Sequence, residues 1–264
     1  MRKYALLLAL AASSVSMAQV TYSTNFDTMS IGNLAGQDGW ITGSGTSNVP
    51  AVTNNAWLSS PNSVMLTRPA SGGSSFNSVS RAFAPGAANA ANRMLIASAD
   101  IFVQSIAGTD RYFGIGFGTS ALATGGYMGI ALGGNGLRGG GGSYASYNDL
   151  AGGLLQSRAL GDFSGRWVRV SVAADRMLTT NNVVFTFSGL GTSGGNATET
   201  FTKSVNFGTT NISHIQLFSD WGSSSTVAGT AFVDNVSFQA VPEPATMAVM
   251  GLGVAALLRR RKRA

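Results

Sequence analysis

Cysteine is absent from this 264-residue sequence, and histidine occurs once, as His214. No disulfide can therefore stabilise the fold, and zinc sites of the usual types are excluded because they combine several cysteine and histidine ligands. Charged residues make up only 11% of the chain, whereas glycine occurs 35 times. This composition is typical of strands and turns rather than of surface helices. His214 is expected to be an ordinary polar or half-buried strand residue.

Positive charge is concentrated at the two ends of the chain, and this explains the high pI of about 10.1. Seven of the 17 positive charges are Arg2, Lys3 and the basic residues in 259–263. Between residues 19 and 242, ten basic side chains balance ten acidic ones. The body is thus neutral and lacks the basic surface that nucleic-acid binding requires, so no nucleic acid is expected as a partner.

The first 18 residues have the three parts of a secretory signal peptide. Arg2 and Lys3 form the positive start, and residues 4–12 form a short apolar core. Small residues at the −3 and −1 positions place the cleavage between Ala18 and Gln19. Because the apolar run is too short to span a bilayer, we predict export rather than a membrane anchor at this end.

The tail, residues 241–264, also has three parts. Pro242-Glu243-Pro244 comes first, followed by 14 uncharged residues from 245 to 258 and by a basic run. Pro244 suits the first turn of a helix, and 14 helical residues reach about 21 Å, so the basic side chains must snorkel to span a core of roughly 30 Å. We predict a short transmembrane helix with its basic end in the cytoplasm and the rest of the chain outside. The basic residues are Arg259, Arg260, Arg261, Lys262 and Arg263.

This order of PEP motif, apolar segment and arginine cluster resembles the PEP-CTERM sorting signal of exported proteins of Gram-negative bacteria. The resemblance implies that a membrane-embedded exosortase recognises the tail at the inner membrane and processes it near the PEP motif. It also implies delivery to the cell surface or to an extracellular polysaccharide matrix, because family members often accompany exopolysaccharide production. An ordinary tail anchor, or an apolar end without a function, is the alternative.

Residues 19–240 are predicted to form one all-β domain, an antiparallel β-sandwich of the jelly-roll type. From 167 to 172 valines alternate with Trp, Arg and Ser, and from 183 to 187 Val and Phe residues share one face. Turn residues lie between these two runs, so a β-hairpin is expected. Gly-, Asn- or Ser-rich turns separate the other predicted strands, which are 21–26, 63–67, 78–84, 95–103, 112–117, 127–132, 200–205, 212–218 and 231–238.

Several segments of this domain resemble concanavalin A-like, or laminin-G-like, jelly rolls. They are Asn25-Phe26-Asp27, Ile31-Gly32-Asn33-Leu34, Gln37-Asp38-Gly39-Trp40, Arg166-Trp167-Val168-Arg169-Val170 with Asp175, and Phe232-Val233-Asp234-Asn235-Val236. In that family the first and last strands lie side by side, which would place Asp27 near Asp234. Two expectations stay open there. In the first, the two carboxylates would hold a structural calcium ion, which prefers several oxygen ligands. In the second, the two carboxylates would be hydrogen-bonded at strand ends. No other cofactor is expected.

Two glycine-rich motifs match catalytic or cofactor patterns without the required context. Residues 191–195 match G-x-S-x-G, but strand-like sequence follows where the nucleophile motif needs a helix. Residues 134–139 match G-x-G-x-x-G, but again no helix follows, so we predict a flexible glycine loop between strands. Glycoside cleavage needs two converging carboxyl groups, and Glu199 is the one glutamate ahead of the tail. The aspartates Asp100, Asp110, Asp149 and Asp162 are interpreted as solvated turn residues.

Carbohydrate binding needs aromatic platforms together with amide, carboxylate or guanidinium groups. Trp40, Trp57 and Trp221 lie in turn-rich segments and are the candidate contacts, although each also fits core or rim packing. Three hypotheses result. The first is a non-enzymatic exported surface or matrix protein without catalytic residues. The second is a carbohydrate-binding module that retains exopolysaccharide, and the third is an extracellular glycoside hydrolase with a diverged site.

Overall fold

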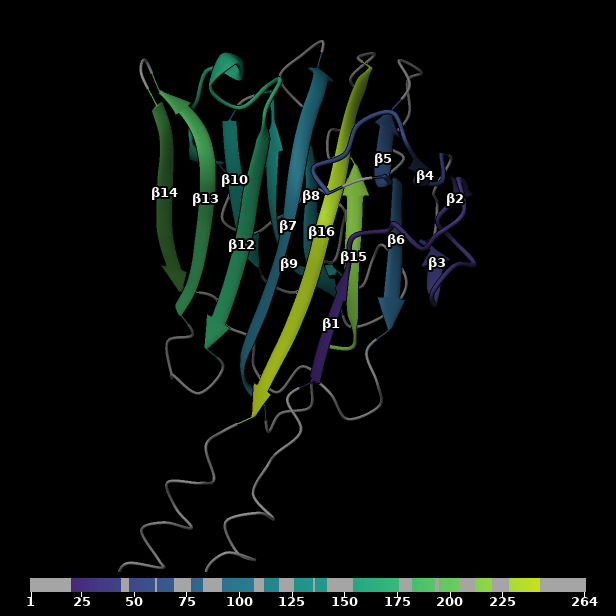
Figure 1. Cartoon of the computed structure of the whole chain (residues 1–264). Helices are drawn as coiled ribbons and strands as arrows, with labels where there is room; N and C mark the ends of the chain where they lie inside the picture. Colours follow the sequence, from purple (N-terminus) through teal and green to yellow (C-terminus); the bar gives the residue numbers. More distant parts are fainter. Residues whose placement is uncertain are drawn as a thin grey trace, which may run out of the picture.

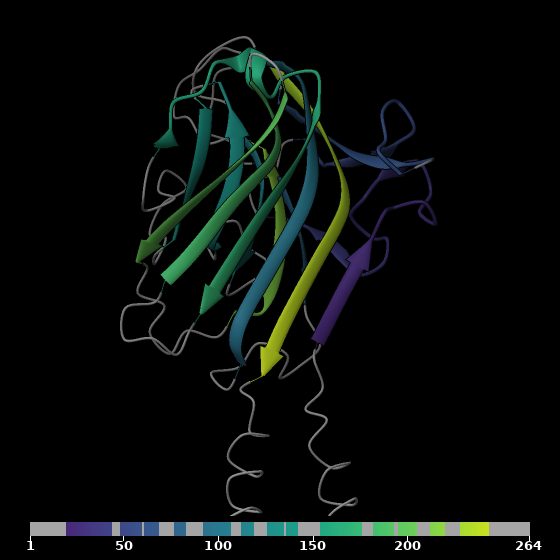
Figure 2. The same cartoon turned by 60° about the vertical axis from the view of Figure 1, so that its left-hand side comes forward.

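A computed structural model shows the fold as two antiparallel β-sheets packed face to face (Figures 1 and 2). Within the described residues the one helix is a short 3-10 turn, η2 (Leu160–Asp162). The structure describes residues 20–43, 48–59, 61–68, 77–82, 92–106, 112–118, 126–134, 136–141, 154–175, 182–192, 195–204, 212–219 and 228–242.

The first sheet has nine strands. Eight of them form a row in spatial order, and β1 (Val20–Thr24) pairs with β16 beside this row. The row is β14 (Gly195–Ser204), β13 (Asn182–Thr192), β12 (Trp167–Asp175), β7 (Asn92–Ile106), β16 (Gly229–Pro242), β5 (Ser63–Arg68), β4 (Ala51–Thr53) and β2 (Gly32–Asn33).

The second sheet has seven strands and lies behind the first in Figure 1. Its long strands pair antiparallel with their neighbours, as in the first sheet. In spatial order the strands are β11 (Leu154–Gln156), β10 (Gly136–Gly141), β9 (Gly126–Gly133), β8 (Tyr112–Gly118), β15 (His214–Ser219), β6 (Asn77–Ala82) and β3 (Trp40–Thr42).

The inner faces of the two sheets form one hydrophobic core. On β12, Val168, Val170 and Val172 are buried while Arg169 is exposed, as the alternation predicts. Phe117 of β8 meets Phe238 of β16 across the layers with ring centroids 5.8 Å apart. Burial of each large apolar side chain contributes about 1.5–3 kcal/mol, so this shared core is the main source of stability in a fold without disulfides.

The first and last strands lie side by side, as the jelly-roll resemblance implies. The register of β1 against β16 runs from Val20 opposite Ala240 to Thr24 opposite Val236. The start of β1 and the end of β16 therefore lie at the same end of the sandwich (Figure 1). The two ends of the folded body are neighbours, each next to one of the two predicted targeting segments.

The long predicted strands are confirmed, including the 167–172 and 183–187 pair, which form β12 and β13. The glycine loop predicted from 134 is wrong in part, because residues 136–141 form β10 between β9 and β11. A Cβ atom on Gly139 would come within 2.6 Å of the Phe185 ring and 2.9 Å of Leu155. Glycine is therefore needed there because side chains from both sheets fill the space. A strand in which four of the six residues are glycine shows no alternation in the sequence.

Both targeting segments lie largely outside the described residues. Ala18, Gln19 and everything after Pro242 belong to this part of the chain, and so does the predicted transmembrane helix. Where the structure is described, no helix is long and apolar enough to cross a membrane. β16 continues through Val241 to Pro242, which pairs with Asn92, so the paired strand extends into the predicted tail.

Trp40 offers a test of the core. Trp40→Ala removes a fully buried side chain and should lower the free energy of unfolding by about 3–5 kcal/mol, whereas Trp57→Ala removes a 42% exposed one and should cost less than about 1 kcal/mol. Denaturant unfolding measures both. Equal costs for the two variants would contradict the burial described for Trp40.

Candidate functional site

The candidate site lies at a β-bulge in β16, where the strand changes its neighbour. Residues up to Val233 pair with β5, and residues from Val236 pair with β1. Against β7, Asp234 is opposite Asp100 and Ser237 is opposite Ser98, so β16 has one extra residue. Asn235 has a φ of 48°, a conformation that asparagine tolerates better than most residues. The bulge therefore points the Asn235 side chain in a direction that the regular alternation of a strand would not give it.

A partly buried ion pair and an amide hydrogen bond join three strands beside this bulge. Arg169 of β12 donates from Nε to Asp100 Oδ1 at 2.7 Å and from Nη2 to Oδ2 at 2.5 Å. Asn235 Nδ2 donates to the same Oδ2 at 2.9 Å. Both oxygens of the Asp100 carboxylate thus accept hydrogen bonds, on the face of the sheet that points away from the core. The hydrogen bond with Asp100 raises the pKa of Arg169 above its usual value, against the opposite effect of burial, and keeps the guanidinium charged.

Asp100 corrects the interpretation of the aspartates as solvated turn residues. The residue is only 3% exposed and lies in the middle of β7, opposite Arg169 on β12. A carboxylate is stable in such a place only with a close cation and further donors, which Arg169 and Asn235 provide. Asp162, in contrast, lies in the η2 turn and forms a surface ion pair with Arg158. Asp110 and Asp149 lie outside the described residues.

The carboxylates of Asp234 and Asp27 accept hydrogen bonds from the backbone of residues 58, 59 and 62. Asp234 Oδ2 accepts hydrogen bonds from the backbone N–H groups of Leu58 and Ser59 at 3.0 and 2.8 Å. Asp27 Oδ1 accepts one from the N–H of Asn62 at 3.1 Å. Both side chains thus act as hydrogen-bond acceptors, Asp27 shortly after the end of β1 and Asp234 at the bulge within β16.

Calcium binding by Asp27 and Asp234 stays a prediction. The described residues contain no group of three His, Cys, Asp or Glu side chains that could hold a metal ion. Each of the two carboxylates already accepts backbone hydrogen bonds, which occupy lone pairs that an ion would need. This donor set does not fit a calcium ion without rearrangement.

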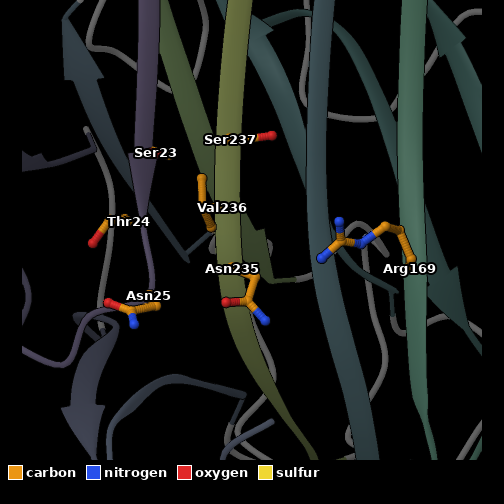
Figure 3. A pocket seen from close by; sticks show the side chains of 7 residues that line it. All are labelled: Ser23, Thr24, Asn25, Arg169, Asn235, Val236 and Ser237. Atoms are coloured by element: carbon orange, nitrogen blue, oxygen red, sulfur yellow. The ribbon is translucent and has the colours of Figure 1, made fainter. Parts of the chain in front are cut away.

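A polar groove of about 430 Å³ runs over the outer face of the sheet next to the bulge. Figure 3 shows Arg169 reaching from β12 across β7 toward Asn235, while Asn25 stands at the end of β1. Nearly all of the lining groups are hydroxyl, amide or guanidinium groups. The lining residues are Ser23, Thr24, Asn25, Arg169, Asn235, Val236 and Ser237.

An aromatic cluster lies further along the same face. Trp167 stacks at an angle on Phe102 with ring centroids 5.5 Å apart, and Phe102 meets Phe232 at 6.2 Å. Trp167 is partly exposed and lies two residues before Arg169, on the same side of β12. The spacing between these two Cα positions is about 7 Å. The indole of Trp167 and the guanidinium of Arg169 are therefore neighbours on β12, with Arg169 lining the groove and Trp167 lying outside the lining.

The three tryptophans predicted as carbohydrate contacts have different places. The prediction of Trp40 as a carbohydrate contact is wrong, because its side chain is fully buried and its Nε1 donates to Tyr22 Oη at 3.0 Å. Trp57 is 42% exposed, on the loop that Asp234 holds. Trp221 lies outside the described residues. Trp167, which had no role in the sequence-based site, is partly exposed and lies on the same face of β12 as Arg169.

The rejected nucleophile motif at residues 191–195 has the expected structure. Thr192 at the end of β13 pairs with Gly195 at the start of β14, so a hairpin stands where a nucleophile motif would need a helix. Glu199 forms an ion pair with Arg158. His214 begins β15 and is half-buried, with Nδ1 2.7 Å from Ser213 Oγ. Burial lowers the pKa of His214 and favours the neutral ring.

Residues 240–263 match the model of the PEP-CTERM protein-sorting motif. The resemblance of the tail is thereby confirmed, and the motif indicates an exported protein that is sorted at the membrane. The match begins at Ala240, inside β16, so the sorting motif starts within the last strand of the sandwich. No curated protein matches the chain.

Solved structures with a similar fold include an endo-β-1,4-glucuronan lyase from the fungus Trichoderma reesei and peanut lectin. The lyase matches with a TM-score of 0.51 at 12% identity, over 83% of this chain and 94% of its own. Peanut lectin matches with a TM-score of 0.51 at 14% identity, over 85% and 98%. At such identities the likeness shows the fold alone, which is the predicted lectin-like jelly roll.

Asp234 tests the network around the bulge. Asp234→Ala leaves the N–H groups of Leu58 and Ser59 without their acceptor and should lower the free energy of unfolding by about 2–4 kcal/mol. Chymotrypsin should then cut faster at Trp57 and Leu58. The control Asp162→Ala, which removes a surface ion pair, should cost about 1 kcal/mol or less. Wild-type stability and cutting in Asp234→Ala would contradict the role of this carboxylate.

Proposed function

We propose that this protein is a non-enzymatic exported protein that an exosortase-type enzyme sorts through its C-terminal tail. Its place of action is the cell surface or the extracellular polysaccharide matrix. The observation that carries the proposal is the match of residues 240–263 to the PEP-CTERM sorting motif. The neutral body and the signal peptide predicted at the other end of the chain support the same route.

The junction between body and tail supports a close approach of the sandwich to the membrane. Pro242, the first residue of the PEP motif, is also the last paired residue of β16. No linker therefore separates the sandwich from the motif. Because β1 begins beside Ala240, the mature N-terminus near Val20 lies at the same end of the body. This arrangement directs the opposite end of the sandwich away from the bilayer.

A second candidate function is carbohydrate binding, as a module that retains extracellular polysaccharide. The polar groove next to Arg169, with Trp167 nearby, favours it because hydroxyl-rich ligands are bound by planar polar groups and aromatic rings. The lectin-like fold by itself does not carry this function.

The hypothesis of a diverged hydrolase has less support. Carboxylates that act as acid and base must be free to exchange protons with a substrate. Asp100 and Asp234 face each other on neighbouring strands, but both accept several internal hydrogen bonds. Glu199 is held by Arg158. These bonds favour a non-enzymatic role for the described residues.

Intact-mass analysis of the mature protein tests the sorting proposal. We expect an N-terminus at Gln19 and a C-terminus at or after Pro242, because peptide bonds up to Pro242 belong to a paired strand. A mature chain that still ends at Ala264 would indicate an ordinary anchor and contradict processing.

Two variants of the basic run at residues 259–263 test its part in sorting, one as the test and the other as its control. Neutral residues in place of Arg259–Arg263 remove the positive-inside signal and should reduce membrane retention before processing. Lysine in place of the four arginines keeps the charge and should leave retention unchanged. If the neutral variant has the same membrane fraction and the same mature mass as the wild type, the basic run does not act as a positive-inside retention signal.

A further inference from the structure

We propose that the groove beside the β16 bulge binds a neutral, hydroxyl-rich saccharide chain, with Arg169 as the central donor and Trp167 as the stacking surface. This inference rests on the second candidate function, carbohydrate binding, and names the place and the class of ligand. The loop with Trp57 then borders the site without forming its platform.

The groove offers both donors and acceptors for hydroxyl groups. Arg169 uses Nε and Nη2 for Asp100, which leaves Nη1 for a ligand on a side chain that is 49% exposed and lines the groove. The exposed hydroxyl of Ser23 and the second N–H of the Asn235 amide add further groups from β1 and β16. Sugar hydroxyls donate and accept at once, so a mixed lining of this kind suits them.

The lining is held in place before any ligand arrives. Ser237 Oγ is 2.8 Å from Ser98 Oγ, and Asn25 Nδ2 donates to Asp27 at 2.5 Å. The bidentate pair with Asp100 fixes the plane of the Arg169 guanidinium. Because these side chains are already ordered, binding loses little conformational entropy.

Charge decides between a neutral and an acidic ligand. The positive charge of Arg169 is matched by Asp100, and the buried carboxylate of Asp234 lies opposite Asp100 on β16. Both carboxylates act electrostatically on Arg169. The described groups around the groove therefore carry no excess positive charge, and a uronate or sulfate would meet two carboxylates for one cation. A neutral saccharide is not repelled.

Size and shape agree with a short stretch of a polysaccharide. A volume of about 430 Å³ is within the usual range of about 300–1,000 Å³ for ligand sites. The Cα of Trp167, whose side chain is partly exposed, lies about 7 Å from that of Arg169 along β12, so one sugar ring could stack on the indole while a neighbouring one reaches the guanidinium. A chain ligand would run along the face of the sheet, across β12, β7 and β16.

The test is binding of the full chain, purified in detergent, to immobilised dextran, mannan and galactan, with alginate as the acidic probe. Ser23→Trp fills the groove from β1 without removing any described hydrogen bond and should weaken binding to the neutral polymer at least tenfold. Thr200→Trp is the matched control, because it places the same ring at an exposed position on the distant edge strand β14 and should bind within twofold of wild type. Arg169→Lys, which keeps the charge but loses the fork, should weaken binding at least fivefold.

The outcomes separate the groove from the broader function. Wild-type affinity in Ser23→Trp, with a wild-type unfolding midpoint, would overturn the groove while leaving carbohydrate binding elsewhere on the chain. If the wild type binds none of the neutral polymers, carbohydrate binding itself fails. Binding to alginate alone, lost at higher salt, would overturn the choice of a neutral ligand.

Discussion

The pairing of β16 is the constraint on which the rest of the structure depends. This strand has β7 on one side along most of its length and is shared on the other side between β5 and β1. It therefore joins the chain start, the sheet centre and the chain end. Without cysteine, this non-local pairing and the core beneath it must hold the body together. The change of partner from β5 to β1 requires the bulge at Asp234 and Asn235.

The bulge converts a folding requirement into a surface feature. Its extra residue carries the Asn235 amide over to Asp100, and the same distortion lets Asp234 reach the segment that contains Leu58 and Ser59. Arg169 completes the network from two strands away. The groove is the outer side of this network, so its polar groups are ordered by bonds that also stabilise the sheet. A ligand site here would require little loss of fold stability, because the hydrogen bonds that order its side chains also stabilise the change of strand partner from β5 to β1.

The sequence predicts the strands whose side chains alternate and the route of export, and it does so for physical reasons. Val168, Val170 and Val172 repeat every second residue because one face of β12 is buried. β10 was missed because its glycines leave room for Phe185 and Leu155 and so show no alternation. Trp40 and Trp57 have similar turn-rich neighbours, and only the packing against Tyr22 and Phe26 separates the buried ring from the exposed one.

The polar network of Asp100, Arg169 and Asn235 could not be predicted from the sequence, for a different reason. Asp100 and Arg169 are 69 residues apart, and Asn235 is 135 residues from Asp100. Their contact depends on the registers of β7, β12 and β16, which no local pattern reports. The available signal was an acidic residue within one strand and a basic residue within another, each next to buried apolar residues, since a buried carboxylate needs a cationic partner.

Hydrogen exchange of the folded chain, followed residue by residue, is the most direct test of the central place of β16. If first and last strands close the sandwich together, the amides of Val236–Ala240 and the β1 amides that face them should exchange only through global unfolding, as slowly as those of β7 and β12. Exchange of β1 and of this half of β16 that is orders of magnitude faster than in β7 and β12 would contradict it. The body would then be closed by other strands, and the tail would begin from a frayed end.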